Sequence, residues 1–370
     1  MNRKGLGMNA CLTRRRLVSI MLPVLACIAC ANGSGLTDLT VVDTVAIDVV
    51  ATDLAPESTQ DDLEIEGPGD LPNDVPSDLL DDVPAVFDTG LELSDVPPDV
   101  VIPEFLGGDR PAALFVPADY DSRKAWPLIM VLHGYGASGF LQAGYLGLSD
   151  RFATKGFVMI TPEGTVDPDG QQFWNAFDSC CDFFGSDVDD VGYLRGLIAQ
   201  AKQVLNIDEE RVYLIGHSNG GFMSFRMACD ASDVITAIVS IAGAMPVGQT
   251  CLPVSPVSIL SIHGTNDETI EYDGGAIGGN ATFVDAPSLI NRWSQLDVCT
   301  VGPVVGAVTL DFDEAVPGNE TSTMGWSACS GGTQVDHWKM TGSIHLPGFN
   351  EAFKEALLVH LQAQRRQKQP

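Results

Sequence analysis

The strongest constraint on the fold of this chain is a strand, a sharp turn and a helix between residues 211 and 229. Residues 211–215 are apolar enough for a buried strand, residues 216–220 read Gly-His-Ser-Asn-Gly, and an apolar helix is expected at 221–229. In such a turn Ser218 sits at a strained backbone angle, and a side chain at either flanking glycine would collide with a neighbouring element. The pattern is typical of a serine used as a nucleophile, but it needs support from the rest of the chain.

Apolar runs rich in β-branched residues alternate with helical periods along the chain. We expect strands at 114–116, 128–132, 157–161, 212–215, 237–241, 257–262 and 335–340, and helices at 191–205, 221–229, 287–296 and 350–364. Continuous apolar strands separated by helices are typical of a mostly parallel sheet that is buried on both faces. The predicted fold class is therefore α/β with three layers. In such folds the chemistry collects at the carboxyl ends of the strands.

The first 30 residues have the composition of an export signal. They contain basic but no acidic residues, and residues 17–29 are apolar. A permanent membrane helix needs about 20 apolar residues, so we expect this segment to be cleaved. Cys27 and Cys30 each follow a small residue, as the acylated cysteine of bacterial lipoproteins does. Ordinary signal-peptidase cleavage is the alternative, and the sequence leaves open whether export uses the general or the twin-arginine route.

Residues 31–100 form a second region of distinct composition. This region contains no Lys or Arg, has frequent Asp and Pro, and has almost no aromatic residues. Such a segment buries too little apolar surface to offset its chain entropy, so we expect a disordered acidic tether. A calcium-binding repeat is the alternative, but calcium loops need glycine to bring several oxygens together, and here Val, Leu and Thr separate the Asp residues.

Residues 101–370 are long enough for one sizeable domain, which we expect to be the catalytic domain. The whole chain has 49 acidic and 20 basic residues, a formal net charge of −29. Such acidity argues against binding to nucleic acid or to an anionic membrane surface. Neutral polymers and small esters remain as candidate substrates, and the sequence does not predict the oligomeric state.

Six cysteines lie outside the export signal. They are Cys180, Cys181, Cys229, Cys251, Cys299 and Cys329. An even number in an exported chain indicates disulfides. We expect Cys299 to pair with Cys329, and Cys180 and Cys181 to reach separately to Cys229 and Cys251 in an order that the sequence does not decide. Adjacent cysteines cannot comfortably supply two ligands to one tetrahedral ion, so no metal site is predicted.

The strand expected at 128–132 leads directly into His133-Gly134-Tyr135-Gly136. In serine hydrolases of this architecture the loop after this strand supplies a backbone N–H to the oxyanion, and the residue after the nucleophile supplies a second. We therefore predict that the N–H groups of Tyr135 and Asn219 form an oxyanion hole, with each donor lowering the barrier by about 3 kcal/mol. The alternative is that His133 and the glycines only turn the chain.

A serine nucleophile needs a histidine base, which follows the acid in the chain order of this architecture. His345 lies in the loop after the strand expected at 335–340, at its carboxyl end, and is the predicted base. His337 lies inside that strand and is kept as the alternative. His360 lies on an amphipathic face of the final helix and is not favoured.

The acid that orients the base is predicted in the same way. Asp267 lies in the loop that follows the strand expected at 257–262. There a carboxylate can fix the imidazole tautomer and stabilise the imidazolium. Glu268 and Asp273 are its rivals in the same loop.

Seven separated motifs in one order resemble the polyhydroxybutyrate depolymerase and feruloyl esterase group of exported α/β-hydrolases, close to carbohydrate esterase family 1. They are His133-Gly134, Trp174-Asn175-Ala176, Cys180-Cys181, Asp189-Asp190-Val191, 216–221, 263–267 and His345-Leu346-Pro347-Gly348. The resemblance covers about 105–365. It implies a three-layer α/β-hydrolase fold and a cofactor-free carboxylic ester hydrolase acting through Ser218, His345 and Asp267. The implied substrates are polyesters or feruloylated or acetylated polysaccharides. Relatives usually have Trp where this chain has Leu346, which puts their substrate preference in doubt here.

Two further pairs of residues have predicted roles. Trp174 and Asn175 are candidates for the border of the substrate cleft, with core packing as an equal alternative for Trp174. Asp189 and Asp190 are expected to cap and charge the helix that begins at Val191.

The predicted protein is an exported esterase, either a lipoprotein at the outer surface or in the periplasm, or a secreted enzyme. The rival prediction is a surface-tethered carbohydrate-binding or adhesion protein on a catalytically idle hydrolase fold.

Overall fold

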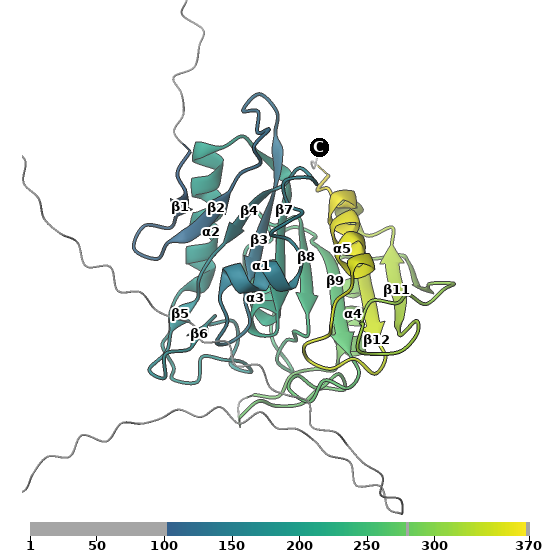
Figure 1. The fold of residues 1–370 in the computed structure, drawn as a ribbon. Helices are drawn as coiled ribbons and strands as arrows, with labels where there is room; N and C mark the ends of the chain where they lie inside the picture. Colours follow the sequence, from purple (N-terminus) through teal and green to yellow (C-terminus); the bar gives the residue numbers. More distant parts are fainter. Residues whose placement is uncertain (1–101, 279–280, 368–370) are drawn as a thin grey trace, which may run out of the picture. The chain divides into compact units, whose positions relative to one another are not determined.

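A computed structural model describes residues 102–278 and 281–367 (Figure 1). The predicted export signal, the predicted tether, Cys27 and Cys30 lie outside the described residues. The helices are α1 (Gly139–Tyr145), α2 (Asp190–Val204), α3 (Asn219–Asp230), α4 (Ala286–Leu296) and α5 (Glu351–Ala363), with a short 3₁₀ turn at Ser330–Gly332. The strands are β1 (Phe105–Leu106), β2 (Ala112–Phe115), β3 (Trp126–Leu132), β4 (Val158–Thr161), β5 (Thr165–Val166), β6 (Gln172–Phe173), β7 (Ile207–His217), β8 (Ala237–Ile241), β9 (Ser258–Gly264), β10 (Val301–Val305), β11 (Thr321–Ser327) and β12 (Val335–Met340).

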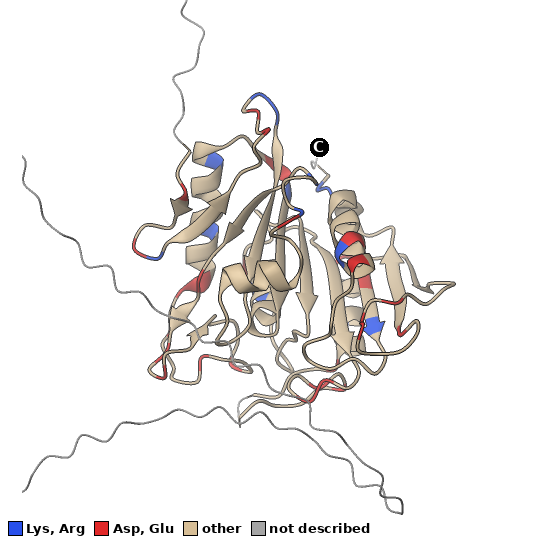
Figure 2. Ribbon diagram, in the orientation of Figure 1, with Lys and Arg blue, Asp and Glu red and all other residues tan. Residues whose placement is uncertain are grey.

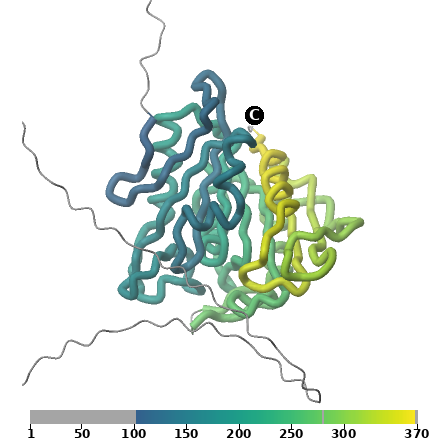
Figure 3. Tube along the Cα trace, viewed as in Figure 1, coloured from purple at the N-terminus to yellow at the C-terminus, as the bar shows by residue number. Residues whose placement is uncertain are grey.

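A ten-stranded sheet runs through this domain in the order β1-β2-β4-β3-β7-β8-β9-β12-β11-β10. Its central strands, from β4 to β12, are parallel, and both edges are antiparallel. The mostly parallel sheet that the sequence predicts is therefore confirmed. In Figure 3 the first half of the described chain lies on one side of the domain and the last part on the other.

Two clusters of buried side chains cover the two faces of the sheet. On β3, Leu128 and Met130 pack with residues of α2, α3 and α4 on one face, whereas Ile129 and Val131 pack with residues of α1 and α5 on the other. Successive side chains of a strand point to opposite faces, so a strand that is apolar throughout joins two helical layers. The three-layer prediction is confirmed.

The elements that were not predicted include α1, β10 and β11. β10 is exposed along its whole length and contains Pro303, and β11 is rich in Thr and Ser, so neither has the continuous apolar run of a buried strand. The short helix α1 contains two glycines, which weaken helix propensity, and Ser138 caps its N-terminus by accepting a hydrogen bond from the N–H of Leu141. These elements depend on tertiary pairing more than on local pattern.

Three disulfides link the six cysteines. The predicted Cys299–Cys329 bond is present. The prediction that Cys180 and Cys181 reach to Cys229 and Cys251 is wrong, because Cys180 bonds to Cys181 and Cys229 to Cys251. Cys229 lies near the end of α3, and its Cα is 5.2 Å from that of Cys251, so these two are natural partners.

Charged residues are distributed unevenly over this domain. In the view of Figure 2, acidic residues mark the loops along the lower edge, below the ends of β9 and β12. Within the part of the chain that the structure describes, helices long and apolar enough to span a bilayer are absent.

Candidate active site

The turn from β7 into α3 holds Ser218 in a strained conformation. Ser218 has φ 55° and ψ −120°, and its N–H donates to the carbonyl oxygen of Ile241 at 2.8 Å. A Cβ on Gly216 would lie 2.0 Å from the carbonyl oxygen of Gly220, and one on Gly220 would lie 2.2 Å from that of Leu132. Only glycine fits at both positions, as the sequence predicts, and the close packing keeps Ser218 in a conformation that costs on the order of 1–3 kcal/mol.

The structure brings the predicted acid and base together. Nδ1 of His345, in the loop after β12, is 2.7 Å from Oδ2 of Asp267, in the loop after β9. The other carboxylate oxygen accepts hydrogen bonds from the N–H groups of Thr269 and Ile270, at 2.9 and 2.8 Å. With the carboxylate as acceptor, Nδ1 of His345 carries the hydrogen and Nε2 is left as the basic nitrogen.

A second histidine also contacts Asp267. Nε2 of His263 lies 3.4 Å from Oδ2 of Asp267 and 2.7 Å from the carbonyl oxygen of Ile270. Burial by itself raises the pKa of Asp267, but the hydrogen bonds from His263, His345 and the Ile270 N–H outweigh burial and hold this pKa well below its ordinary value. Asp267 is therefore a stable carboxylate at neutral pH.

The loop that carries His345 is fixed by two side chains from other elements. Nε2 of His217, the residue before the nucleophile, donates to the carbonyl oxygen of His345 at 2.8 Å. The hydroxyl of Tyr145 on α1 donates to the carbonyl oxygen of Pro347 at 2.8 Å. Burial lowers the pKa of His217 to about 4, so this ring is neutral above pH 5. His217 thus ties the base to the nucleophile turn.

Ser218 and His345 line one cavity of about 260 Å³, which we call the Ser218 cavity. It is lined by Ser218, His217, His345 and Leu346, by Gly134, Tyr135 and Ala137 of the loop after β3, and by Leu141, Gln142 and Tyr145 of α1. Loops after β3, β7 and β12 therefore meet at one edge of the sheet, where parallel α/β sheets place their sites. The cavity opens to solvent beside exposed Leu141 and Leu346.

The loop after β3 lies directly against the nucleophile turn. A Cβ on Gly134 would be 3.4 Å from Cβ of Ser218. Within residues 102–278 and 281–367 the N–H of Tyr135 donates no hydrogen bond, and Asn219 is the first residue of α3, where N–H groups lack an intrahelical acceptor. Two backbone donors are thus free beside Ser218, as an oxyanion hole requires.

His133 fixes the peptide group that presents the Tyr135 N–H. Its Nε2 accepts a hydrogen bond from the N–H of Gly164 at 2.8 Å, so Nδ1 carries the hydrogen and donates to the carbonyl oxygen of Gly134, also at 2.8 Å. In a trans peptide the C=O and the following N–H point in opposite directions. Holding the Gly134 carbonyl therefore aims the Tyr135 N–H away from the His133 ring. Burial lowers the pKa of His133 to about 4, which preserves this neutral tautomer.

The rival residues lie outside this arrangement. His337 is buried in β12, with Nε2 3.0 Å from the Tyr272 hydroxyl. His360, on α5, packs its ring against Trp338 of β12. Glu268 and Asp273 are exposed, whereas Asp267 is only 4% exposed. The residues selected by their position after strands are therefore those that the fold brings together.

The structure gives Trp174 the core-packing role that the sequence left as its alternative. Trp174 is fully buried, and its indole N–H donates to the carbonyl oxygen of His133 at 3.0 Å, so this side chain supports the loop after β3 from within the core. Asn175 donates through its side chain to the carbonyl oxygen of Val188. Neither residue lines the Ser218 cavity.

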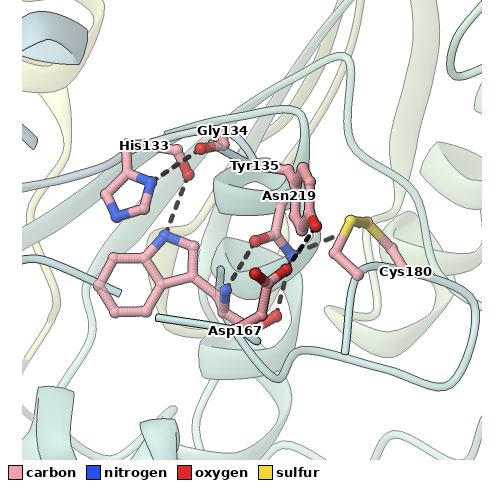
Figure 4. The surroundings of a disulfide bond; sticks show 8 residues. His133, Gly134, Tyr135, Asp167, Cys180 and Asn219 are labelled. Atoms are coloured by element: carbon pink, nitrogen blue, oxygen red, sulfur yellow. Dashed lines mark hydrogen bonds between the residues drawn. A yellow bond between two sulfur atoms is a disulfide. The ribbon is translucent and has the colours of Figure 1, made fainter. Parts of the chain in front are cut away.

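The side chain of Asn219 joins the nucleophile turn to the segment that holds Trp174. Its Oδ1 accepts from the Trp174 N–H at 2.7 Å and its Nδ2 donates to the Trp174 carbonyl oxygen at 2.9 Å. The same Nδ2 lies 3.7 Å from Sγ of Cys180 (Figure 4). The Cys180–Cys181 disulfide is thus a direct neighbour of the proposed oxyanion donor.

At the start of α2 both acids lie where the sequence predicts. Asp189 caps the helix by accepting from the N–H of Gly192 at 2.8 Å. Asp190 is the acidic residue of the first turn, and its buried side chain also pairs with Arg110 at 2.5 Å. Among residues 102–278 and 281–367, clusters of three or more His, Cys, Asp or Glu side chains able to bind a metal ion are absent.

Sequence reasoning missed His217, His263 and Tyr145 as parts of the site. His217 and His263 each lie in a motif already singled out, so their spacing from Ser218 and Asp267 was a usable signal. Tyr145 lies on α1, which was not predicted, and its contact with Pro347 spans 202 residues of sequence. No local pattern indicates such a contact.

The chain has the α/β-hydrolase fold. Residues 119–280 match the model of the phospholipase/carboxylesterase family of α/β-hydrolases. Among solved structures, an acetyl xylan esterase from Aspergillus awamori superimposes with a TM-score of 0.50 at 14% identity, over 70% of this chain and 98% of that one. At this identity the likeness concerns the fold alone.

Curated relatives include feruloyl esterases from fungi. Feruloyl esterase B of Piromyces equi is 28% identical over 240 residues, which are 63% of this chain and 42% of that protein. Feruloyl esterase C of Emericella nidulans is 28% identical over 182 residues, 47% of this chain and 61% of that protein. The chain therefore spans less than two thirds of each of these relatives. The predicted resemblance to the feruloyl esterase group is confirmed by these matches.

Proposed function

We propose that this protein is a serine carboxylic-ester hydrolase with Ser218 as nucleophile, His345 as base and Asp267 as the acid that orients the base. The observation that carries the proposal is the 2.7 Å contact between Nδ1 of His345 and Asp267, with Ser218 and His345 lining one cavity. Three residues from three separate loops would have no reason to converge in this order if each served only to turn the chain.

The proposed reaction proceeds through an acyl-enzyme. Oγ of Ser218 attacks the ester carbonyl carbon while Nε2 of His345 takes the hydroxyl proton, giving a tetrahedral intermediate whose oxyanion accepts from the N–H groups of Tyr135 and Asn219. The C–O bond then breaks, and His345 returns the proton to the leaving alcohol. Water, deprotonated by His345, attacks the acyl-enzyme and releases the carboxylic acid and free Ser218. The steps use these side chains, the two backbone N–H groups and water.

For the substrate, we propose feruloyl or acetyl esters of plant polysaccharides, with a polyhydroxybutyrate-type polyester as the alternative. The names of the curated relatives support feruloyl esters. The acidic loops below the ends of β9 and β12 favour a neutral polymer over an anionic one. A panel of feruloylated arabinoxylan, acetylated xylan and polyhydroxybutyrate would separate these substrates.

The test of the chemistry is Ser218→Ala, assayed with p-nitrophenyl acetate and methyl ferulate. We expect loss of turnover by at least about 10³-fold with the melting temperature kept. Ser288→Ala is the matched control, because Ser288 is an exposed serine on α4. Unchanged turnover in Ser218→Ala would refute the assignment.

A fluorophosphonate probe separates this proposal from a catalytically idle binding protein. The probe should label the parent protein and the Ser288→Ala variant but not Ser218→Ala. Absence of labelling in all three, with binding to xylan retained, would favour the carbohydrate-binding or adhesion protein instead.

We also propose that the protein is exported and lipid-anchored through Cys27 or Cys30. The three disulfides support export, since disulfides persist in oxidising compartments. Metabolic labelling with a palmitate analogue should be lost in the variant of the acylated cysteine, Cys27→Ala or Cys30→Ala, and retained in the other. Release of an unlabelled parent protein into the medium would instead indicate ordinary secretion.

A further inference from the structure

His263 is a second histidine beside the acid of the proposed triad, and it has no part in the reaction above. It lies near the end of β9 and is 2% exposed. Its Nε2 is 2.7 Å from the carbonyl oxygen of Ile270 and 3.4 Å from Oδ2 of Asp267. Because a carbonyl oxygen can only accept, Nε2 carries the hydrogen and donates it to Ile270, with Asp267 as a second, more distant acceptor.

The other side of the His263 ring fixes this tautomer. Nδ1 is buried and has no hydrogen-bond partner among residues 102–278 and 281–367, so a hydrogen placed there would be a buried donor without an acceptor. The ring meets the Tyr272 ring edge to face, with centroids 5.6 Å apart, and the Tyr272 hydroxyl lies 3.0 Å from Nε2 of His337. These surroundings leave His263 with one donor, which faces the loop of the acid.

The bonds of His263 and Asp267 close the loop at 264–270. Oδ1 of Asp267 accepts from the N–H of Ile270 at 2.8 Å, and the carbonyl oxygen of Ile270 accepts from His263. Ile270 is therefore held through both of its backbone polar groups, and Oδ2 of Asp267 is left 2.7 Å from Nδ1 of His345. A donor that also approaches Oδ2 draws part of the negative charge away from His345.

We propose that His263 is a positioning residue of the reaction, which orients the Asp267 carboxylate and limits how strongly this carboxylate holds protonated His345. The inference rests on the proposed esterase function. His263 does not line the Ser218 cavity, so it acts through Asp267 and not on the ester. Without its donor, Oδ2 would present more charge to the His345 imidazolium, which would then persist to higher pH and leave less free base.

The experiment compares His263→Leu and His263→Gln with the parent enzyme, using methyl ferulate or p-nitrophenyl acetate, whichever the parent hydrolyses faster. In His263→Leu we expect kcat to fall about tenfold with KM unchanged. The acid limb of the pH profile of kcat/KM should move up by about 0.3–1 pH unit. Glutamine keeps a donor near the position of Nε2, so His263→Gln should retain the parent's acid limb and most of its kcat.

The neighbouring titratable groups do not obscure this measurement. Those that face the pair of His263 and Asp267 from other elements are His217, His337, Tyr272 and Lys339. Burial lowers the pKa of His217 to about 4 and that of His337 to about 3, and burial raises the pKa of Tyr272 to about 12. These three groups therefore keep one charge state from about pH 5 to pH 9, where the acid limb is measured.

His337→Leu is the matched control, because His337 is equally buried and lies in the neighbouring strand β12. It should lower the melting temperature but keep the parent's kcat and acid limb. If His263→Leu does not fold, His263→Asn takes its place, since its shorter amide cannot reach the position of Nε2.

The direction of the pH shift decides the outcome. An acid limb that stays in place or moves to lower pH in His263→Leu would overturn the inference even if kcat fell, because lost packing alone slows the reaction without changing its pH dependence. The same upward shift in His263→Gln or in His337→Leu would also overturn it. If the parent hydrolyses neither ester, the proposed esterase function itself fails.

Discussion

The nucleophile turn at 216–221 and the loop of the proposed base at 343–348 are held in place by different means. In the turn, backbone atoms pack so closely that a methyl group at Gly216 or Gly220 would meet a carbonyl oxygen at 2.2 Å or less. In the base loop, Ile344 and Leu346 are 55% and 58% exposed, and His345 is held by separate hydrogen bonds to His217 and Asp267. The nucleophile turn is fixed by close packing of backbone atoms, and the base loop by individual hydrogen bonds.

This difference predicts two kinds of response to substitution. A turn fixed by close packing cannot be disrupted in part, because an added atom must displace the neighbouring backbone. A loop fixed by several hydrogen bonds can lose them one at a time, each with a limited effect. Substitutions in the turn should therefore damage stability and activity together, whereas those around the base should lower activity in steps.

The largest expected effect on stability is that of Gly220→Ala. Its new Cβ would lie 2.2 Å from the carbonyl oxygen of Leu132 and 2.7 Å from that of His133. We expect the free energy of unfolding to fall by about 3 kcal/mol and ester hydrolysis to fall at least about 100-fold. Urea unfolding and a p-nitrophenyl acetate assay measure the two effects.

Gly196→Ala is the control for this substitution. Gly196 lies in α2, and a Cβ added there would have no atom within 4 Å apart from those of its own helix and chain neighbours. Alanine should raise stability there by about 0.5–1 kcal/mol. If Gly220→Ala behaved like Gly196→Ala, close packing would not be what holds the turn.

Asp267→Asn should produce the largest loss of activity with the fold retained. Asparagine has the same shape, but it favours the wrong tautomer of His345 and cannot stabilise its imidazolium. We expect kcat to fall about 10⁴-fold with methyl ferulate. A loss below about tenfold, with the fold intact, would remove Asp267 from the proposed triad.

The same variant has a defined pH dependence of stability. The pKa of Asp267 is lower in the folded protein than its ordinary value of 3.8, so the stability that its carboxylate contributes is present above that value and is lost as the pH falls through the folded pKa. The stability difference between parent and Asp267→Asn should therefore be largest near pH 7 and shrink below about pH 4. Urea unfolding at pH 7, 5 and 3 measures it, and a difference that grows on acidification would contradict this sign.

The sequence predicted the parts of the site that depend on strand ends. Ser218 and Asp267 each follow a continuous apolar strand, and His345 follows the mixed strand β12. Parallel strands end at one edge of a sheet, so the convergence of these residues could be expected from pattern alone. The antiparallel edge formed by β10 and β11 could not be expected from pattern, because β10 is exposed throughout and β11 is rich in Thr and Ser. Its pairing with β12 depends on contacts that have no local period.

What the sequence left open or mispredicted around the site has one physical origin. Trp174 lies in a loop, where an aromatic residue suggests a ligand, but its burial beneath the loop after β3 depends on bonds to Asn219 and His133. The pairing of Cys180 with Cys181 likewise depends on where α3 places Cys229. The burial of Trp174 and the pairing of the cysteines both depend on distances between residues far apart in the chain. Such distances cannot be predicted from composition.

His217→Leu tests the contact between the two regions. It removes the hydrogen bond to the carbonyl oxygen of His345, so we expect kcat to fall about 10- to 100-fold. His217→Gln, which keeps a donor near the position of Nε2, should retain most of the activity. Because burial lowers the pKa of His217 to about 4, neither variant should change the shape of the pH–rate profile above pH 5. Equal losses in the Leu and Gln variants would show that ring packing, and not the hydrogen bond, fixes the loop.

The smallest expected effect is that of Tyr145→Phe. It removes only the hydroxyl that donates to Pro347, two residues beyond the base, and leaves the ring packed against His217 and Phe349. We expect a two- to fivefold loss of kcat and a loss of about 1 kcal/mol of stability.

Tyr193→Phe is the control, since its hydroxyl also donates to a backbone carbonyl oxygen, that of Arg110, at 3.0 Å. It should lose similar stability and no activity. If Tyr145→Phe reduced kcat as strongly as His217→Leu, the contacts of the base loop would act as one cooperative unit, and the contrast with the nucleophile turn would not hold.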